Sequence, residues 1–322
     1  MSEATEASGQ PVQVDAVSFV RAESDTYFDS LLAASGGLGS WHHIREPAPV
    51  DNQLVVRLNR DTLYSSAIID VSEGAELTMP ETGGRYQTAM VVDQDHYVSK
   101  VYDHPGIHRL TPGDFDSPWV AIAVRTLADP GDPDDLRAVG ALQDRLAVNA
   151  RSARPFTHPA WDPQSLAGTR KLLLELARGL TSMKGAFGSR QQTNPVTHLL
   201  GTAAGWGGLP EDQALYIGVE PSLPTGHCTL TVGAVPVRGF WSVSVYNHDG
   251  YFQPNELGRY SVNSVTAVPN GDGSVTINFG GDPDLPNQIP VMEGWNYTVR
   301  LYQPQPELLD GRWTFPALSH VR

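Results

Sequence analysis

The C-terminal third of the chain carries alternating patterns that are typical of β-strands. In the segment FWSVSVY at 240–246, one face carries phenylalanine, two serines and tyrosine, and the other carries tryptophan and two valines. Both faces are therefore apolar or small. Side chains along a strand point alternately to opposite faces, so the pattern predicts a strand that is buried on both sides. Further strands are expected at 274–279 and 297–302, and the turn segments 247–250 and 270–273 lie between the first strand and the second. Strands spaced by turns, without helical periodicity between them, predict an antiparallel sandwich.

The middle of the chain predicts helices. Asp132 with Pro133, and Asp162 with Pro163, each place an N-cap residue before a proline at the first helical position. Apolar residues with a helical period follow both pairs. A short third helix is expected at 209–219. We therefore expect a helical layer between two β units.

Longer motifs make the chain similar to a known pair of domains. The segments FWSVSVYNHDGYFQPN, NQIP and RLYQPQPELLDGRW resemble domain of unknown function 1214. Upstream, NRDTLYSSAIIDV, GGRYQTAMVVDQDHYV and RTLADPGDPDDLRAVGALQD resemble its usual partner, domain of unknown function 1254. The resemblance implies an immunoglobulin-like β-sandwich followed by a jelly-roll-like β-sandwich. It implies no activity, because neither domain has an assigned one.

These patterns predict a mainly β protein with a helical connector. We expect a disordered tail at 1–13, an N-terminal helix at 14–40, an immunoglobulin-like sandwich at 41–130, a helical connector at 131–208 and a jelly-roll-like sandwich at 209–322. The N-terminal helix should end at the glycine pair that begins at Gly36. No long low-complexity linker separates the two halves, so we expect them to pack closely.

Composition and charge narrow the classes of partner. The chain has 322 residues, enough for two domains of ordinary size. It has 36 acidic and 22 basic residues, which gives a formal charge of −14. Binding to phosphate backbones needs clustered Lys and Arg, so this acidic protein is not expected to bind nucleic acid. No apolar run approaches the roughly 20 residues that a membrane span requires, so no membrane partner is expected.

The chain contains a single cysteine, Cys228, which excludes an intrachain disulfide. The first 13 residues are acidic and polar, and they lack the basic flank and apolar stretch of an export signal. From these features we expect a cytoplasmic protein.

Standard catalytic motifs are missing from the sequence. It contains no G-x-S-x-G elbow, no phosphate-binding glycine loop followed by Lys, and no H-E-x-x-H motif. His43, Asp95 and His96 are residue types that bind metals, but no spacing motif groups them. We therefore expect neither a metal nor another cofactor.

The first candidate cluster is the polar run at 93–97, which directly follows the apolar residues 90–92. Burying such groups without partners costs about 1–3 kcal/mol each, so the run is unusual in a core strand. It either leaves the core with solvated carboxylates, or it lines a pocket between the domains. In the second case burial would shift the pKa of Asp95 or His96 into a range that suits proton transfer, and Tyr97 would contact the ligand. Asp95 and His96 point apart in a regular strand, so both line one cavity only if the strand ends or bulges there.

The second candidate cluster is 59–64. Tyr64 and Asp61 are candidates for acid–base chemistry, and Arg60 for ligand binding, because a phenol beside a guanidinium can bind a carboxylate or a carbonyl. Alternatively, Arg60 and Asp61 are structural and tie a loop to the second domain. His43 could join either cluster as a ligand contact.

Aromatic residues are concentrated in the second half of the chain and suggest a different function. Such rings either pack in the core and interface or form a surface that binds sugars or small amphipathic ligands. Tyr246, Asn255 and Arg259 are the ligand contacts expected in this half. The aromatic residues in question are Trp206, Trp241, Tyr246, Tyr251, Phe252, Trp295, Tyr297 and Tyr302.

Three functions stay open at this point. The first is an enzyme that acts on a small organic molecule by proton transfer, hydrolysis or elimination at an interdomain pocket, with Asp95, His96, Tyr64 and Asp61 as its catalytic residues. The second is a non-catalytic binder of small molecules or glycans that uses an aromatic jelly-roll surface. The third is a structural or assembly subunit. A homo-oligomer is open under each of the three.

Overall fold

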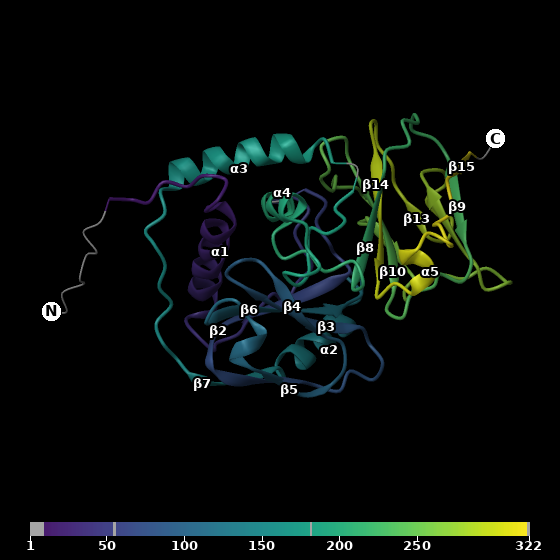
Figure 1. Cartoon of the computed structure of the whole chain (residues 1–322). Coiled ribbons are helices and arrows are strands. Elements are labelled where there is room, and N and C mark those ends of the chain that lie inside the picture. The colour runs from purple at the N-terminus through teal and green to yellow at the C-terminus, as the bar shows by residue number, and fades with distance from the viewer. Residues whose placement is uncertain (1–9, 54–55, 181, 321–322) are drawn as a thin grey trace.

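The computed structural model describes residues 10–53, 56–180 and 182–320. Its structure is mainly β, with two β units side by side and few helices (Figure 1). The helices α1 (Phe19–Ser35), α3 (Pro163–Ala177) and α4 (Pro195–Gly205) lie over one face of the first unit (Figure 1). The predicted fold class, mainly β with helices that connect two β units, is confirmed.

The first unit is one sheet that folds into two layers around its own apolar core. Strand β2 is 18 residues long, and its first half pairs with β6 while its second half pairs with β5 and β7. The register shifts between Asp70 and Ala75, and this irregularity lets one strand serve both layers. The strands are β1 (His42–His43), β2 (Thr62–Met79), β3 (Gln87–Asp93), β4 (Val98–Tyr102), β5 (Gly106–Leu110), β6 (Trp119–Leu127) and β7 (Ala147–Ser152), with a short 3-10 helix η1 (Pro112–Asp114).

The second unit is a sandwich of two four-stranded sheets. One sheet has the order β11-β10-β14-β8 and the other β13-β12-β9-β15. The predicted strands at 240–246, 274–279 and 297–302 correspond to β10, β12 and β14, so these predictions are confirmed. The elements are β8 (Ala214–Val219), β9 (Cys228–Val232), β10 (Trp241–Tyr246), β11 (Ser261–Asn263), β12 (Val275–Phe279), β13 (Gln288–Ile289), β14 (Asn296–Tyr302), α5 (Pro306–Leu309) and β15 (Ser319–His320).

Strands β10 and β14 are buried along their whole length. Val243 and Val299 pack into the core between the two sheets of the sandwich. The alternate residues are polar, and among them Ser244 and Arg300 face the first unit, where Arg300 donates to the carbonyl of Arg57. The interface between the units is therefore a buried polar surface, whose groups must find hydrogen-bond partners in the first unit.

The helices begin where side-chain caps are available. Asp132 caps α2 (Pro133–Gln143) by accepting from Asp134 N, and Asp162 caps α3 by accepting from Ser165 N, so both predicted starts are confirmed. Helix α4 begins in the same way after Asn194, but the sequence analysis did not predict it. The helix predicted at 209–219 is wrong, because its residues alternate in burial and form β8, which pairs with β14.

The N-terminal helix is shorter than the predicted range 14–40. Helix α1 starts at Phe19 and ends at Gly36, whose φ of 82° is left-handed and whose N–H donates to Leu32 O. Of the tail predicted to be disordered, residues 1–9 lie outside the described residues, while Val12 forms a β-bridge with Trp161. Strand β7 lies inside the range predicted as a helical connector and belongs to the first sheet.

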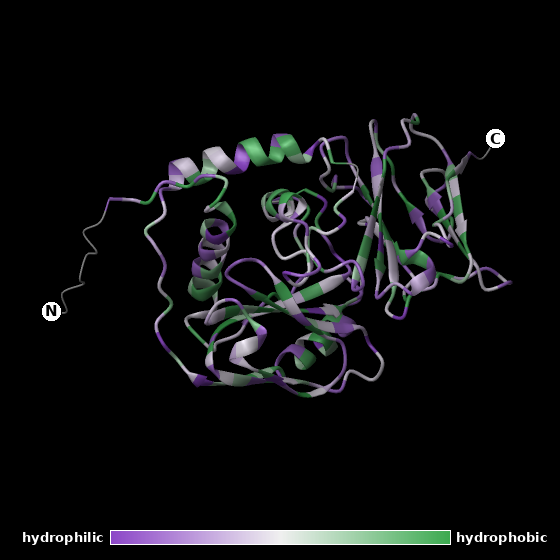
Figure 2. Cartoon of the chain, viewed as in Figure 1, coloured by the Kyte–Doolittle hydropathy of each residue, from purple (hydrophilic) through white to green (hydrophobic). Residues whose placement is uncertain are grey.

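Helix α3 crosses the outside of the helical layer (Figure 1). Its C-terminal half is strongly apolar (Figure 2), although Leu172 and Leu176 are exposed. Leu166 and Leu173 point the other way and pack with α1 and α4.

A single apolar cluster joins the two units. Met90 and Ile68 of the first sheet pack in the same cluster as Phe240 and Tyr302 of the second unit. The rings of Phe240 and Tyr302 stack with their centroids 4.3 Å apart. Each unit has its own core, and this third cluster adds apolar contacts that both units share.

We therefore expect the intact chain to unfold in one transition. Replacing Phe240 with Ala should lower the free energy of unfolding by about 3–5 kcal/mol and keep a single transition, because the cavity lies in the shared core. Calorimetry and urea titration would measure this, with Leu172→Ala on the exposed side of α3 as a control that should change little. Two separate transitions, with only one of them moved by Phe240→Ala, would contradict the expectation.

Candidate functional site

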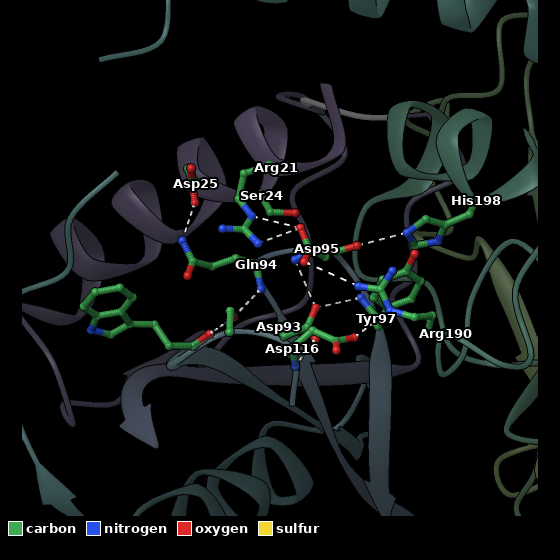
Figure 3. A network of polar contacts seen from close by, with 12 residues as sticks. Arg21, Ser24, Asp25, Asp93, Gln94, Asp95, Tyr97, Asp116, Arg190 and His198 are labelled. Carbon is green, nitrogen blue, oxygen red and sulfur yellow. Dashed lines mark hydrogen bonds and ion pairs between the residues drawn. The ribbon is translucent and has the colours of Figure 1, made fainter. Parts of the chain in front are cut away.

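The polar run at 93–97 forms a closed turn at the end of β3. The strand ends at Asp93, and His96 adopts a left-handed φ of 61°, so the alternation of a regular strand does not continue. The Asp93 carboxylate accepts hydrogen bonds from the backbone N–H groups of Asp95, Tyr97 and Asp116 (Figure 3). These bonds fix the turn and use the carboxylate oxygens internally.

Side chains of this turn connect the first sheet to α1. Arg21 donates from Nε and Nη2 to one Asp95 oxygen at 2.9 and 2.7 Å, and Gln94 donates to Asp25 at 2.7 Å (Figure 3). The Tyr97 ring lies under the guanidinium of Arg190, at 4.4 Å. The turn therefore acts as an attachment point for the helical layer.

Both ring nitrogens of His96 have partners. Its Nε2 accepts from Gly207 N at 2.8 Å, so the proton is on Nδ1, which donates to Thr202 Oγ1 at 2.8 Å. Thr202 in turn donates to His198 O. Burial lowers the pKa of His96 to about 3, with His198 as a smaller cause, so the ring is neutral. This histidine joins α4 to the turn and has no nitrogen left for a ligand.

Four other predicted ligand contacts are dispersed. His43 contacts Ser65 through Nδ1 at 2.8 Å. Arg60 turns away from Tyr64 and lies over the Tyr260 ring at 5.2 Å. Asn255 and Arg259 bond to each other within one exposed turn. The structure does not bring these four together.

Tyr64 lies at the interface between the units, beside a residue that the sequence analysis missed. Tyr64 on β2 and Arg125 on β6 are cross-strand partners, and the guanidinium carbon is 5.4 Å from the centre of the phenol ring. Arg125 donates from Nη2 to Gly207 O at 2.7 Å, while its buried Nη1 has no acceptor. Burial raises the pKa of Tyr64, but Arg125 together with Asn59 and Thr62 outweighs this, and the net pKa lies below 10.0.

Asp61 and Tyr246 lie at the same interface. Asp61 is fully buried, with one oxygen 3.4 Å from both Ser261 Oγ and Asn263 Nδ2 and the other without a partner. Tyr246 donates to the carbonyl of Leu58 at 2.7 Å. The four predicted catalytic residues therefore fall into two places, with Asp61 and Tyr64 at the interface and Asp95 and His96 under the helical layer.

A cleft of about 830 Å³ opens between the two units, and none of the predicted site residues lines it. Gln87 on its wall is 4% exposed and donates from Nε2 to Thr126, while its Oε1 has no partner. The residues that line the cleft include Arg85, Tyr86, Gln87 and Asp103 from the first unit and Arg238, Phe240, Val265 and Gln303 from the second.

Tyr86 connects this cleft to the Tyr64–Arg125 pair. Its ring lines the cleft and lies 5.3 Å from the ring of Tyr302. The Tyr302 hydroxyl accepts from Asn59 Nδ2 at 3.0 Å, and the same amide group lies 3.4 Å from Tyr64 Oη. The cleft and the buried pair are therefore neighbours separated by aromatic rings.

Across 10–53, 56–180 and 182–320, no group of three or more His, Cys, Asp or Glu side chains could hold a metal ion. No helix in these ranges is long and apolar enough to cross a membrane.

The geometry defines a protein of two β units with a polar interface and a cleft between them. Residues 38–106 match the family model of a protein of unknown function, DUF1254, and residues 224–306 match that of DUF1214. The two matches stand in the order that the motifs indicated, so the resemblance to this pair of domains is confirmed. None of the curated protein sequences matches the chain.

Two solved structures share the fold. The VPA0106 protein from Vibrio parahaemolyticus is 19% identical, with a TM-score of 0.72 over 95% of this chain and 98% of that chain. An uncharacterized protein from Burkholderia cenocepacia is 16% identical, with a TM-score of 0.53 over 94% of this chain and 86% of that one. At these identities the similarity establishes the fold alone.

The environment of His96 predicts a pH dependence of stability. The folded pKa of about 3 lies below the ordinary value of 6.5, so the unfolded chain binds more protons between these values. His96 therefore contributes stability above pH 6.5 that is lost as the pH falls towards 3, by roughly 3–5 kcal/mol. Asp93, whose pKa burial raises to about 6, contributes with the opposite sign, so the test compares wild type with a variant.

His96→Asn removes the titration and keeps a residue that tolerates the left-handed backbone. Urea titrations from pH 7 to pH 4 should show a flatter loss of stability in this variant than in wild type. His248→Asn, at an exposed histidine, is the matched control and should follow wild type. Parallel curves for wild type and His96→Asn would show that His96 is not held neutral in the fold.

Proposed function

We propose that this protein binds a small organic molecule in the cleft between its two β units. The supporting observation is the cleft itself, whose volume of about 830 Å³ falls within the range of small-molecule sites. Both units contribute to its walls, so the site exists only in the assembled chain. The unpartnered Oε1 of Gln87 supplies an acceptor that a ligand could satisfy.

The chemistry of the walls favours a polar ligand with an apolar portion. Arg85 is neutralised by an ion pair with Asp135, and Asp103 accepts from Gln303 Nε2 at 2.9 Å. Tyr86 and Phe240 supply aromatic surface. The two arginines of the walls, Arg85 and Arg238, are both paired with carboxylates, and the remaining carboxylates leave the walls net negative. Hydrogen bonds and ring contacts would add to the recognition of a ligand.

The enzyme hypothesis gains support at Tyr64 and loses it at His96. A general base needs a free atom within reach of its substrate, and both nitrogens of His96 are already bonded. Asp95 is bound by Arg21. Tyr64, beside Arg125 and with a lowered pKa, is the predicted residue best suited to proton transfer in this region.

The two other hypotheses have less support. Glycan binding on an aromatic surface needs exposed rings, whereas most of the rings concerned are buried in the core or interface. The buried ones are Trp241, Tyr246, Phe252, Trp295, Tyr297 and Tyr302. An assembly role, including a homo-oligomer, is supported by the exposed Leu172 and Leu176 of α3.

Blocking the cleft tests the proposed function. Val265 lines the cleft and is 63% exposed, so Val265→Trp should fill it without disturbing the core. Val268, which is 56% exposed on the same loop and does not line the cleft, provides the matched control Val268→Trp. Native mass spectrometry would be recorded after exposure to a defined mixture of small organic acids, amines and sugars.

We expect an adduct with wild type and with Val268→Trp that is lost with Val265→Trp. The same adduct on all three proteins would place the ligand elsewhere. No adduct from any class of compound would count against small-molecule binding in the cleft.

A further inference from the structure

Arg125 carries a buried positive charge that its surroundings leave partly unpaired. The residue is 8% exposed, its Nη2 donates to Gly207 O, and its Nη1 has no acceptor. Within the described part of the chain, no carboxylate forms an ion pair with it. The contact with the Tyr64 ring offsets only part of the cost of burying a charge that has no ion-pair partner. No negative charge next to Arg125 therefore balances the positive charge of its guanidinium.

The groups around Arg125 offer donors rather than acceptors. Asn59 points its amide N–H groups at the hydroxyls of Tyr302 and Tyr64, at 3.0 and 3.4 Å. Each of these phenols therefore receives a hydrogen bond and keeps its own O–H to donate. A guanidinium with free phenol hydroxyls beside it is the donor set that a carboxylate accepts.

Two tyrosines beside Arg125 are partly exposed. Tyr216 on β8 is 48% exposed. Burial of its phenol raises its pKa overall, and the nearby guanidinium of Arg125 acts in the opposite direction. Tyr64 itself is half-buried. Neither Tyr64 nor Arg125 lines the cleft described above.

We propose that Arg125 and Tyr64 form a binding site for a small carboxylate, with the free Nη1–H of Arg125 and the hydroxyl of Tyr64 as its donors. This site is separate from the cleft and goes beyond the proposed function. A small organic acid would supply the negative charge that the interface lacks, and its oxygens would accept from both donors.

Anion binding and the ionisation of Tyr64 must be coupled. Arg125 favours the phenolate of Tyr64, and a carboxylate bound at Arg125 offsets that effect. Bound carboxylate therefore raises the pKa of Tyr64. By linkage, the carboxylate binds less tightly as the pH rises through that pKa.

The experiment uses the full chain with sodium acetate as the probe, against sodium chloride at equal ionic strength. Calorimetric titration measures the dissociation constant. Tyrosinate absorbance, taken as wild type minus Tyr64→Phe, follows the titration of Tyr64. We expect acetate to shift this titration to higher pH, and Arg125→Met to weaken acetate binding roughly tenfold or more.

Two further variants keep the test decisive if Arg125→Met does not fold. Tyr64→Phe keeps the ring and removes one donor, so it should weaken acetate severalfold, whereas Arg312→Met at an exposed arginine should not. Val265→Trp should leave acetate binding unchanged, and its loss there would place acetate in the cleft and overturn the proposal. Acetate that leaves the Tyr64 titration unmoved, or that binds Tyr64→Phe and wild type equally, also overturns it. Neither of these last two results bears on the cleft.

Discussion

The structure depends on the buried polar face of β10 and β14. Arg300 is the centre of this face, and its guanidinium needs acceptors that the second unit supplies only in part. The carbonyls of Arg57 and Leu58 in the first unit provide the others, and Tyr246 bonds to Leu58 as well. Removing one partner of a buried charge costs much more than the pair contributes to stability. The two units are therefore held in one relative position by hydrogen-bond requirements as well as by apolar packing, and this fixed position creates the cleft.

Against this background, buried groups that lack partners are informative. His96 is a residue type that is common in catalytic sites, but both of its ring nitrogens are bonded, one to α4 and one to the segment that follows it. Arg125 and Gln87 attracted no attention in the sequence, yet each keeps a buried polar atom without a partner. Native proteins satisfy nearly all such groups, so the exceptions call for an explanation. The described residues hold nine such atoms, and those of Asp61, Gln87 and Arg125 lie where the two units meet, which supports a function at the interface.

The features that were predicted correctly from the sequence are those that a few neighbouring residues determine. The caps at Asp132 and Asp162 and the doubly buried β10 follow from short patterns and were read correctly. The helix predicted at 209–219 is wrong, because the side chains of 214–219 alternate in burial as those of a strand do. Helix α4 was not predicted, although Asn194 and Pro195 repeat the capping pattern of the other two helices. The candidate site was harder to predict. Tyr64 was recognised, but its partner Arg125 comes from strand register, which no local pattern in a single sequence reveals. The separation of Asp95 and His96 from Tyr64 likewise depends on where β3 ends.

The interface also has a consequence for synthesis on the ribosome. The chain emerges from its N-terminus, so the carbonyls of Arg57 and Leu58 and the apolar side chains of Ile68 and Met90 appear long before β14, which covers them. During that interval the nascent first sheet exposes an apolar surface and backbone carbonyls without hydrogen-bond partners. Such a surface makes a nascent chain prone to aggregation. Cells that make this protein therefore face a waiting period, and the helical layer, which is translated before the second unit, is placed to shield part of that surface in the meantime.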